Sequence, residues 1–103
     1  MTYEGVPERG PKGGLSVFQD GMELDPRYSQ AVINHSPDGF NWGYGGSGPA
    51  QLALALLLEE TGRRRALAHY QAFKWQNIAR MVQDKPWTLS SVDILDWLNK
   101  QEG

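Results

Sequence analysis

Hydrophobic and polar residues alternate in short runs over the first part of the chain, a pattern typical of β-strands. Residues 15–19 and 22–24 alternate in this way, with Asp20 and Gly21 between them. An Asp-Gly pair in this position favours a hairpin, because a type I′ turn requires positive φ at both central residues. We therefore predict an antiparallel hairpin here, with a further short strand at residues 3–6.

A second hairpin is expected farther along the chain. Residues 31–35 have the composition of a strand, and residues 36–39, Ser-Pro-Asp-Gly, have the residue order of a type I turn. Residues 40–44 would return as a strand whose alternate positions place three aromatic rings on one face. These rings belong to Phe40, Trp42 and Tyr44. Such a row usually forms the inner face of a sheet, although an exposed row beside basic residues can stack on single-stranded bases.

A continuous apolar run predicts a buried helix in the second half of the chain. Residues 52–58 are hydrophobic on every side of a helix, so this helix should be central and almost wholly buried. Gly48 fits the N-cap of this helix, and Pro49 fits its first helical position. Gln51 occupies the position of the glutamine in a capping box. Gly62 is a natural C-terminal stop.

Two further helices are expected in the second half. The first runs from about residue 64 to residue 83. On a 3.6-residue wheel its apolar side holds Leu67, Tyr70, Trp75, Ile78, Met81 and Val82. Residues 86–87 mark a loop, and Ser90 then caps the last helix with Asp93 in the third helical position. Residues 25–28, which begin Asp-Pro, predict one helical turn in the first half.

These elements predict an α+β fold, in which a small antiparallel sheet from the N-terminal half packs on three helices from the C-terminal half. One domain is expected over residues 1–103, with residues 1–14 loop-rich or partly flexible. The absence of cysteine excludes disulfides and thiolate metal sites. The N-terminus has no basic-then-apolar signal region, and no apolar run is long enough to span a bilayer, so we expect a cytoplasmic location.

The formal net charge of −2 is unevenly distributed along the chain. Residues 63–85 carry six basic side chains and one acidic one, a local charge of +5, whereas the rest of the chain has a charge of −7. A basic segment can face nucleic acid or an acidic protein, or it can be the ordinary solvated face of a helix. The candidate residues for nucleic-acid binding are Arg63, Arg64, Arg65, His69 and Arg80.

The most informative segment is residues 36–51, which holds five glycines between Gly39 and Gly48 and leads into the apolar helix. Free N–H groups and the dipole at a helix N-terminus favour an anion. The phosphate loop of nucleotide hydrolases needs a lysine and a Ser/Thr after its last glycine, whereas Pro49 and Ala50 stand here. The dinucleotide-binding spacing GxGxxG is also not met. A closely packed connection is the ordinary explanation, and an anion-binding or catalytic loop is the alternative.

His35, Ser36 and Asp38 are the residue types of a hydrolase triad. Neighbours on a strand point to opposite faces, so His35 and Ser36 are poorly placed to act as base and nucleophile. His35 and His69 alone fall short of the three protein ligands of a usual metal site. The sequence therefore assigns no catalytic residue, no metal and no cofactor. In an enzyme, His35 would be the acid–base group.

Three runs of residues carry a resemblance to a known family. They are residues 34–40 (NHSPDGF), residues 42–55 (WGYGGSGPAQLALA) and the pairs YQ and FK within residues 70–74. Over about residues 15–98 the chain resembles a family of small uncharacterised bacterial, plasmid and phage proteins, classed as a domain of unknown function. The resemblance implies frequent presence on mobile elements, and it implies no activity and no catalytic residues.

We hypothesise that the protein is a non-enzymatic accessory factor of a phage or plasmid, with another protein as its partner and no membrane contact. The candidate surface combines the glycine-rich loop with polar side chains of the second helix. It comprises His35, Tyr44, Gly45, Gly46, Ser47, Gln51, Gln71 and Lys74. Because an unpaired buried ammonium is costly, Lys74 should hydrogen-bond to loop carbonyls or pair with an acidic residue. The alternatives are a small-anion binder or enzyme using residues 43–48, and nucleic-acid binding through residues 63–85.

Overall fold

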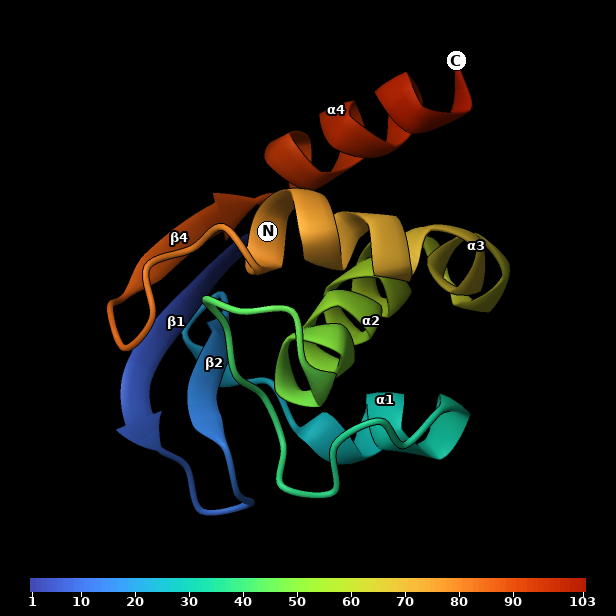
Figure 1. Cartoon of the computed structure of the whole chain (residues 1–103). Coiled ribbons are helices and arrows are strands. Elements are labelled where there is room, and N and C mark those ends of the chain that lie inside the picture. The colour runs from blue at the N-terminus through green and yellow to red at the C-terminus, as the bar shows by residue number, and fades with distance from the viewer.

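A four-stranded antiparallel sheet lies on one side of the protein, and helices lie on the other (Figure 1). The computed structural model describes residues 1–103. The strands are β1 (Thr2–Arg9), β2 (Leu15–Gln19), β3 (Met22–Glu23) and β4 (Trp87–Ser90). The helices are α1 (Pro26–Val32), α2 (Ser47–Thr61), α3 (Arg63–Phe73), the π-helix η1 (Lys74–Ile78) and α4 (Ser91–Glu102). This arrangement confirms the predicted α+β class.

The first predicted hairpin is present. β2 and β3 pair antiparallel, with Gln19 opposite Met22. Asp20 and Gly21 connect them with φ values of 49° and 83°, the positive angles that a type I′ turn needs. β1 pairs with β2 and extends to Arg9, beyond the predicted residues 3–6, so the strand order is β3-β2-β1-β4.

The other edge of the sheet comes from the C-terminal half of the chain, where the sequence predicted only a loop at residues 86–87. β4 pairs antiparallel with β1 and places Trp87 opposite Gly5. A Cβ atom built on Gly5 would lie 2.1 Å from Nε1 of Trp87, so the indole covers the glycine directly. Trp87 also meets Trp42 edge-on, with ring centroids 5.6 Å apart. Packing against a distant strand and ring therefore makes this short segment a strand.

The second predicted hairpin is wrong. Asp25 caps α1 by accepting a hydrogen bond from the backbone N–H of Arg27, as predicted, but the helix continues through Val32. Residues 40–44 form no strand, and Phe40 makes only one isolated bridge, parallel, to Gly14. The aromatic row accordingly divides, because Phe40 and Trp42 are buried in the core whereas Tyr44 is partly exposed.

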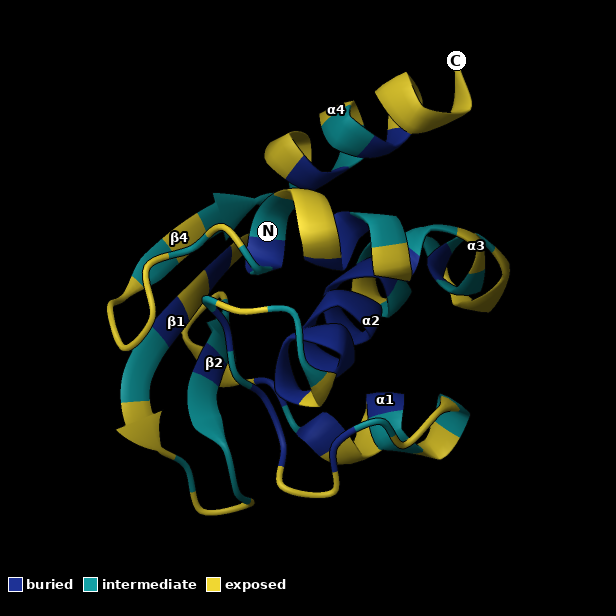
Figure 2. Ribbon diagram, viewed as in Figure 1, coloured by how far each residue is buried: buried dark blue, intermediate teal, exposed yellow.

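Helix α2 is buried along almost its whole length, as its apolar composition predicted (Figure 2). Every residue from Gly48 to Leu57 is buried, and the helix contacts α1, α3, η1 and α4. The core around it also includes Tyr3 and Val17 of the sheet. The helix begins at Ser47 and ends before Gly62, so the predicted C-terminal stop is confirmed.

We expect truncation of α2 in its centre to be strongly destabilising. Leu56 is fully buried, so Leu56→Ala should lower the free energy of unfolding by about 2–5 kcal/mol, through lost burial and the cavity left behind. Urea denaturation monitored by tryptophan fluorescence measures this difference. Val92→Ala on the exposed face of α4 is the control, with an expected change within about 0.5 kcal/mol. Equal effects of the two substitutions would contradict a central position for α2.

The second predicted helix changes its geometry in the middle. α3 ends at Phe73, and residues 74–78 form a π-helix in which the N–H of Ala79 donates to the carbonyl of Lys74, five residues back. A π-turn is wider than an α-turn and rotates all later side chains around the axis. Trp75, predicted on the apolar side, lies within this turn and is exposed. Val82 is exposed beyond the end of η1 at Ile78, because the helix predicted to reach residue 83 stops there.

The predicted start of the last helix is confirmed. Ser90 accepts a hydrogen bond from the N–H of Asp93, and the Asp93 carboxylate accepts one from the N–H of Ser90, which completes a capping box. Where α4 begins, Glu60 of α2 accepts hydrogen bonds from Tyr3 and Ser91. Burial, and then this hydrogen bond to Glu60, raise the pKa of the Tyr3 phenol well above its usual range. None of the helices combines the length and apolar character needed to cross a membrane.

Candidate functional site

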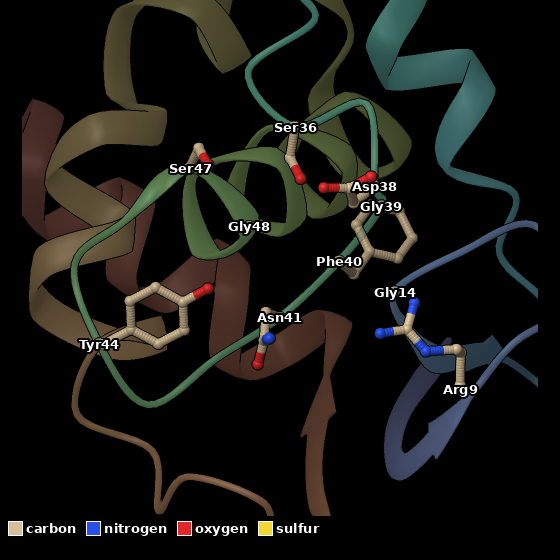
Figure 3. A pocket seen from close by; sticks show the side chains of 10 residues that line it. All are labelled: Arg9, Gly14, Ser36, Asp38, Gly39, Phe40, Asn41, Tyr44, Ser47 and Gly48. Atoms are coloured by element: carbon tan, nitrogen blue, oxygen red, sulfur yellow. The ribbon is translucent and has the colours of Figure 1, made fainter.

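A cavity of about 250 Å³ opens at the N-terminus of α2 (Figure 3). The turn at residues 36–39, the loop before α2 and the end of β1 surround it. The polar side chains that line it are those of Arg9, Ser36, Asp38, Asn41, Tyr44 and Ser47. The turn has the predicted form, because the N–H of Gly39 donates to the carbonyl of Ser36 at 3.1 Å. The cavity is mostly polar, and it lies in the segment that the sequence singled out.

The glycines of the loop are explained by close packing. A Cβ on Gly45 would lie 2.2 Å from the Trp75 ring, and one on Gly46 would lie 2.5 Å from the Tyr44 ring. Gly43 has a φ of 86° and lies against the backbone of Gln83. Each of these positions excludes a side chain, so the ordinary explanation from the sequence accounts for these glycines.

Gln51 is structural and does not belong to the predicted binding surface. Its side chain is fully buried and forms four hydrogen bonds. Its carbonyl accepts from the N–H groups of His35 and Ser36, and its amide donates to Ser29 Oγ and to the carbonyl of Ile33. It therefore holds residues 33–36 on α2 and makes no capping box.

His35 also has a structural contact. Its Nε2 shares a hydrogen bond of 2.6 Å with the hydroxyl of Tyr70 on α3, and its ring lies 5.4 Å from the Tyr70 ring. It does not line the cavity, whereas Ser36 and Asp38 do. The three side chains form no hydrogen bonds with one another, so the geometry supports no Ser-His-Asp relay.

Lys74 and Trp75 lie beside the glycine-rich loop. The Lys74 ammonium forms no hydrogen bond with the loop and no ion pair, which corrects the prediction from the sequence. It lies instead 4.3 Å from the centroid of the Trp75 ring, although the residue is only 7% exposed. This cation–π contact provides part of the compensation that the buried charge requires. Gln71 is exposed one turn earlier on α3.

The basic residues predicted for nucleic-acid binding are only partly available. Arg65 forms two hydrogen bonds with the Glu102 carboxylate at 3.0 and 2.6 Å, and His69 forms a third at 3.0 Å. The hydrogen bonds from Arg65, more than the contact with His69, lower the pKa of the Glu102 carboxyl. Arg63, Arg64 and Arg80 remain exposed. The C-terminal helix thus occupies part of the basic face.

The structure brings no three His, Cys, Asp or Glu side chains together in a position to hold a metal ion.

The family model for a family of unknown function, DUF6166, matches residues 3–100. The chain belongs to this family. No curated protein matches the chain, and no solved structure does. The family match covers almost the whole chain and begins earlier than the resemblance at residues 15–98.

In this DUF6166 member, reasoning from the sequence missed two residues beside the loop. Arg9 reaches the cavity from the end of β1, and nothing near it in the sequence connects it with residues 36–48. Trp75 was assigned to the apolar side of a regular helix, but it lies in the π-helix and is 56% exposed. In the sequence, the only feature that drew attention to the segment around Trp75 was the unusual position of Lys74 on the apolar side of the helical wheel.

Proposed function

We propose that this protein acts by binding another protein at an exposed aromatic surface beside the glycine-rich loop. This Tyr44–Trp75 surface consists of the exposed residues Tyr44, Gln71 and Trp75 with Gly45 between them, and the nearly buried Lys74 contributes its ammonium beside Trp75. The observation that carries the proposal is the exposure of Trp75, which is 56% accessible in a chain whose other tryptophans are buried or only partly exposed. Tryptophan and tyrosine are enriched among the residues that dominate binding energy at protein interfaces.

The support for these rings makes the surface rigid. The Trp75 ring lies on Gly45 and the Tyr44 ring lies on Gly46, so consecutive glycines support both rings. The Lys74 ammonium lies over the Trp75 ring, 4.3 Å from its centroid. Side chains that are held in place before binding lose less conformational entropy when a partner docks.

The π-helix is a second reason to place the function here. π-Turns are uncommon and frequently occur at functional sites. Residues 74–78 form such a turn, and it contains both Trp75, which is exposed, and Lys74, whose ammonium lies over the Trp75 ring. The exposed ring therefore lies within the irregular turn.

The proposed role is that of a non-enzymatic accessory factor. The resemblance to plasmid and phage proteins supports a partner that belongs to, or is controlled by, a mobile element. We propose that the two proteins meet in the cytoplasm, because a chain without cysteine fits a reducing compartment.

Replacement of Trp75 should abolish capture of the partner. Tagged wild-type protein and the Trp75→Ala variant are compared by affinity capture from a lysate of the natural host, followed by mass spectrometry. A protein recovered by the wild type should be lost with Trp75→Ala, because truncation of a central interface tryptophan weakens binding by about thirtyfold or more. Titration of the purified partner with both proteins then measures the ratio directly.

Two tyrosine substitutions complete the comparison, one within the proposed surface and one matched control outside it. Tyr44→Ala should weaken binding, whereas Tyr28→Ala, at a residue of α1 that is 73% exposed, should leave binding unchanged. A partner retained by Trp75→Ala, or one lost equally with Tyr28→Ala, would contradict the proposed surface.

A further inference from the structure

We propose that the cavity at the N-terminus of α2 binds the phosphate group of a small phosphate monoester. This proposal concerns a different ligand from the protein partner proposed above, and each can fail without the other. The starting observation is that several polar groups line the cavity without a hydrogen-bond partner inside the protein. They are the hydroxyls of Ser36, Tyr44 and Ser47, the amide nitrogen of Asn41 and the guanidinium of Arg9.

Ser36 provides the most specific of these groups. The residue is only 7% exposed, yet its hydroxyl has no hydrogen-bond partner and faces the cavity (Figure 3). Its backbone is held on both sides, because its N–H donates to Gln51 and its carbonyl accepts from Gly39 and Gln30. The oxygen itself is accessible from the cavity, because the buried side-chain atoms without a partner are only Nδ2 of Asn77 and Nε1 of Trp87. A hydroxyl that is fixed in place and open to the cavity is a preformed donor for a ligand.

The N-terminus of α2 supplies hydrogen-bond donors of a second kind, which are backbone N–H groups. α2 has fifteen residues, and its cap residue, Gly46, offers no side chain to the first turn. The N–H groups of Ser47 and Gly48 precede the first helical hydrogen bond, which joins the N–H of Ala50 to the carbonyl of Gly46 at 3.1 Å. Free N–H groups and the helix dipole together favour an anion at this position.

Arg9 supplies a positive charge for the bound phosphate. Its guanidinium extends from the end of β1 toward the cavity and forms no ion pair in the protein (Figure 3). A guanidinium can donate two parallel hydrogen bonds to a phosphate. Donors from β1, from the turn and from α2 thus surround the same space, which suits a tetrahedral group with three free oxygens better than a planar carboxylate.

Asp38 indicates what the phosphate is attached to. Its carboxylate lines the same cavity and repels an anion, so it must face an uncharged part of the ligand. A carboxylate accepts hydrogen bonds from alcohol hydroxyls. The volume of about 250 Å³ lies just below the range of about 300–1,000 Å³ usual for small-molecule sites. The ligand class is therefore a small phosphorylated compound with free hydroxyls, of the size of a sugar phosphate.

The test is a titration of the ¹⁵N-labelled protein with ribose 5-phosphate at constant ionic strength, followed by amide chemical shifts. We expect the amides of Ser47 and Gly48 to shift and to saturate. Ser36→Ala and Arg9→Gln should each weaken binding about tenfold or more, because each removes a hydrogen bond to a charged group. Ser47→Ala, at an exposed side chain, should also weaken binding, and it tests the site without altering a buried position.

Matched controls use residues outside the cavity. Ser16→Ala and Arg64→Gln should leave the affinity for ribose 5-phosphate within about twofold of the wild type. Inorganic phosphate should bind at the same amides, whereas acetate and ribose should bind at least tenfold more weakly than ribose 5-phosphate. The proposal is overturned if Ser47 and Gly48 do not respond to ribose 5-phosphate, if acetate or ribose binds equally well, or if Ser36→Ala, Ser47→Ala and Arg9→Gln bind like the controls.

Discussion

Gln51→Leu is expected to lower the free energy of unfolding by about 3 kcal/mol or more, although the new side chain has a similar size and is apolar. Gln51 is fully buried within α2, and its amide forms four hydrogen bonds to residues 29–36. Leucine leaves two backbone N–H groups and one carbonyl without their partner, whereas the Ser29 hydroxyl keeps its hydrogen bond to the carbonyl of Pro26. A buried polar group left unsatisfied costs about 1–3 kcal/mol, and part of this cost is recovered where water can reach the loop.

Guanidinium denaturation with linear extrapolation measures this difference. Gln71→Leu is the matched control, because Gln71 is exposed on α3 and forms no side-chain hydrogen bond. Its substitution should change stability by no more than about 0.5 kcal/mol. A loss below about 1 kcal/mol for Gln51→Leu would mean that residues 33–36 are held by other contacts. Since the N–H of Ser36 is bound to Gln51, the same variant should also disturb the cavity at the N-terminus of α2.

Gly43→Ala is expected to lower the free energy of unfolding by about 3 kcal/mol, and the loss has two parts. Gly43 has a φ of 86°, a conformation that costs an alanine about 1–2 kcal/mol. Its Cβ would also lie 2.6 Å from Cα of Gln83, so the loop or the segment after η1 must move. Overpacking of this kind costs about 1–3 kcal/mol. Movement here also strains the hydrogen bond of 3.0 Å from the N–H of Gly43 to the carbonyl of Ile78.

A second glycine separates the two contributions. Gly21 has nearly the same φ, 83°, but nothing lies within 4 Å of a Cβ built there. Gly21→Ala should therefore show the backbone cost alone, and the difference between the two variants measures the close contact with Gln83. Thermal and chemical denaturation of both variants provide the comparison. Equal losses at the two positions would show that the loop yields to the added methyl group without cost.

The candidate site could be predicted only in part. The glycine-rich composition directed attention to residues 36–51, and the cavity does lie there. Gln51 was taken as a surface residue but is fully buried, and the contact of His35 with Tyr70 was not foreseen, because a hydrogen bond to a distant partner leaves no local mark in a sequence. Arg9 was missed for the same reason, since the chain must fold before β1 reaches the turn.

The sequence by itself determined the elements that are set by interactions between residues close together in the chain. Asp20 and Gly21 make the hairpin because of their own backbone preferences. Ser90 begins α4 through a partner only three residues away, and α2 is buried because nearly every side chain over two turns is apolar. These choices depend on interactions within a few residues, so they can be read without knowing the rest of the chain.

The tertiary structure decided whatever required a distant partner. Residues 87–90 are a strand because β1 offers them a free edge, and residues 40–44 are not a strand because no strand edge pairs with them. Trp75 is exposed and lies in a π-turn at residues 74–78, a geometry that a 3.6-residue wheel does not represent. Long-range pairing and packing outweigh local propensity at such positions, because the energy of the folded contacts exceeds the small intrinsic preferences of the residues.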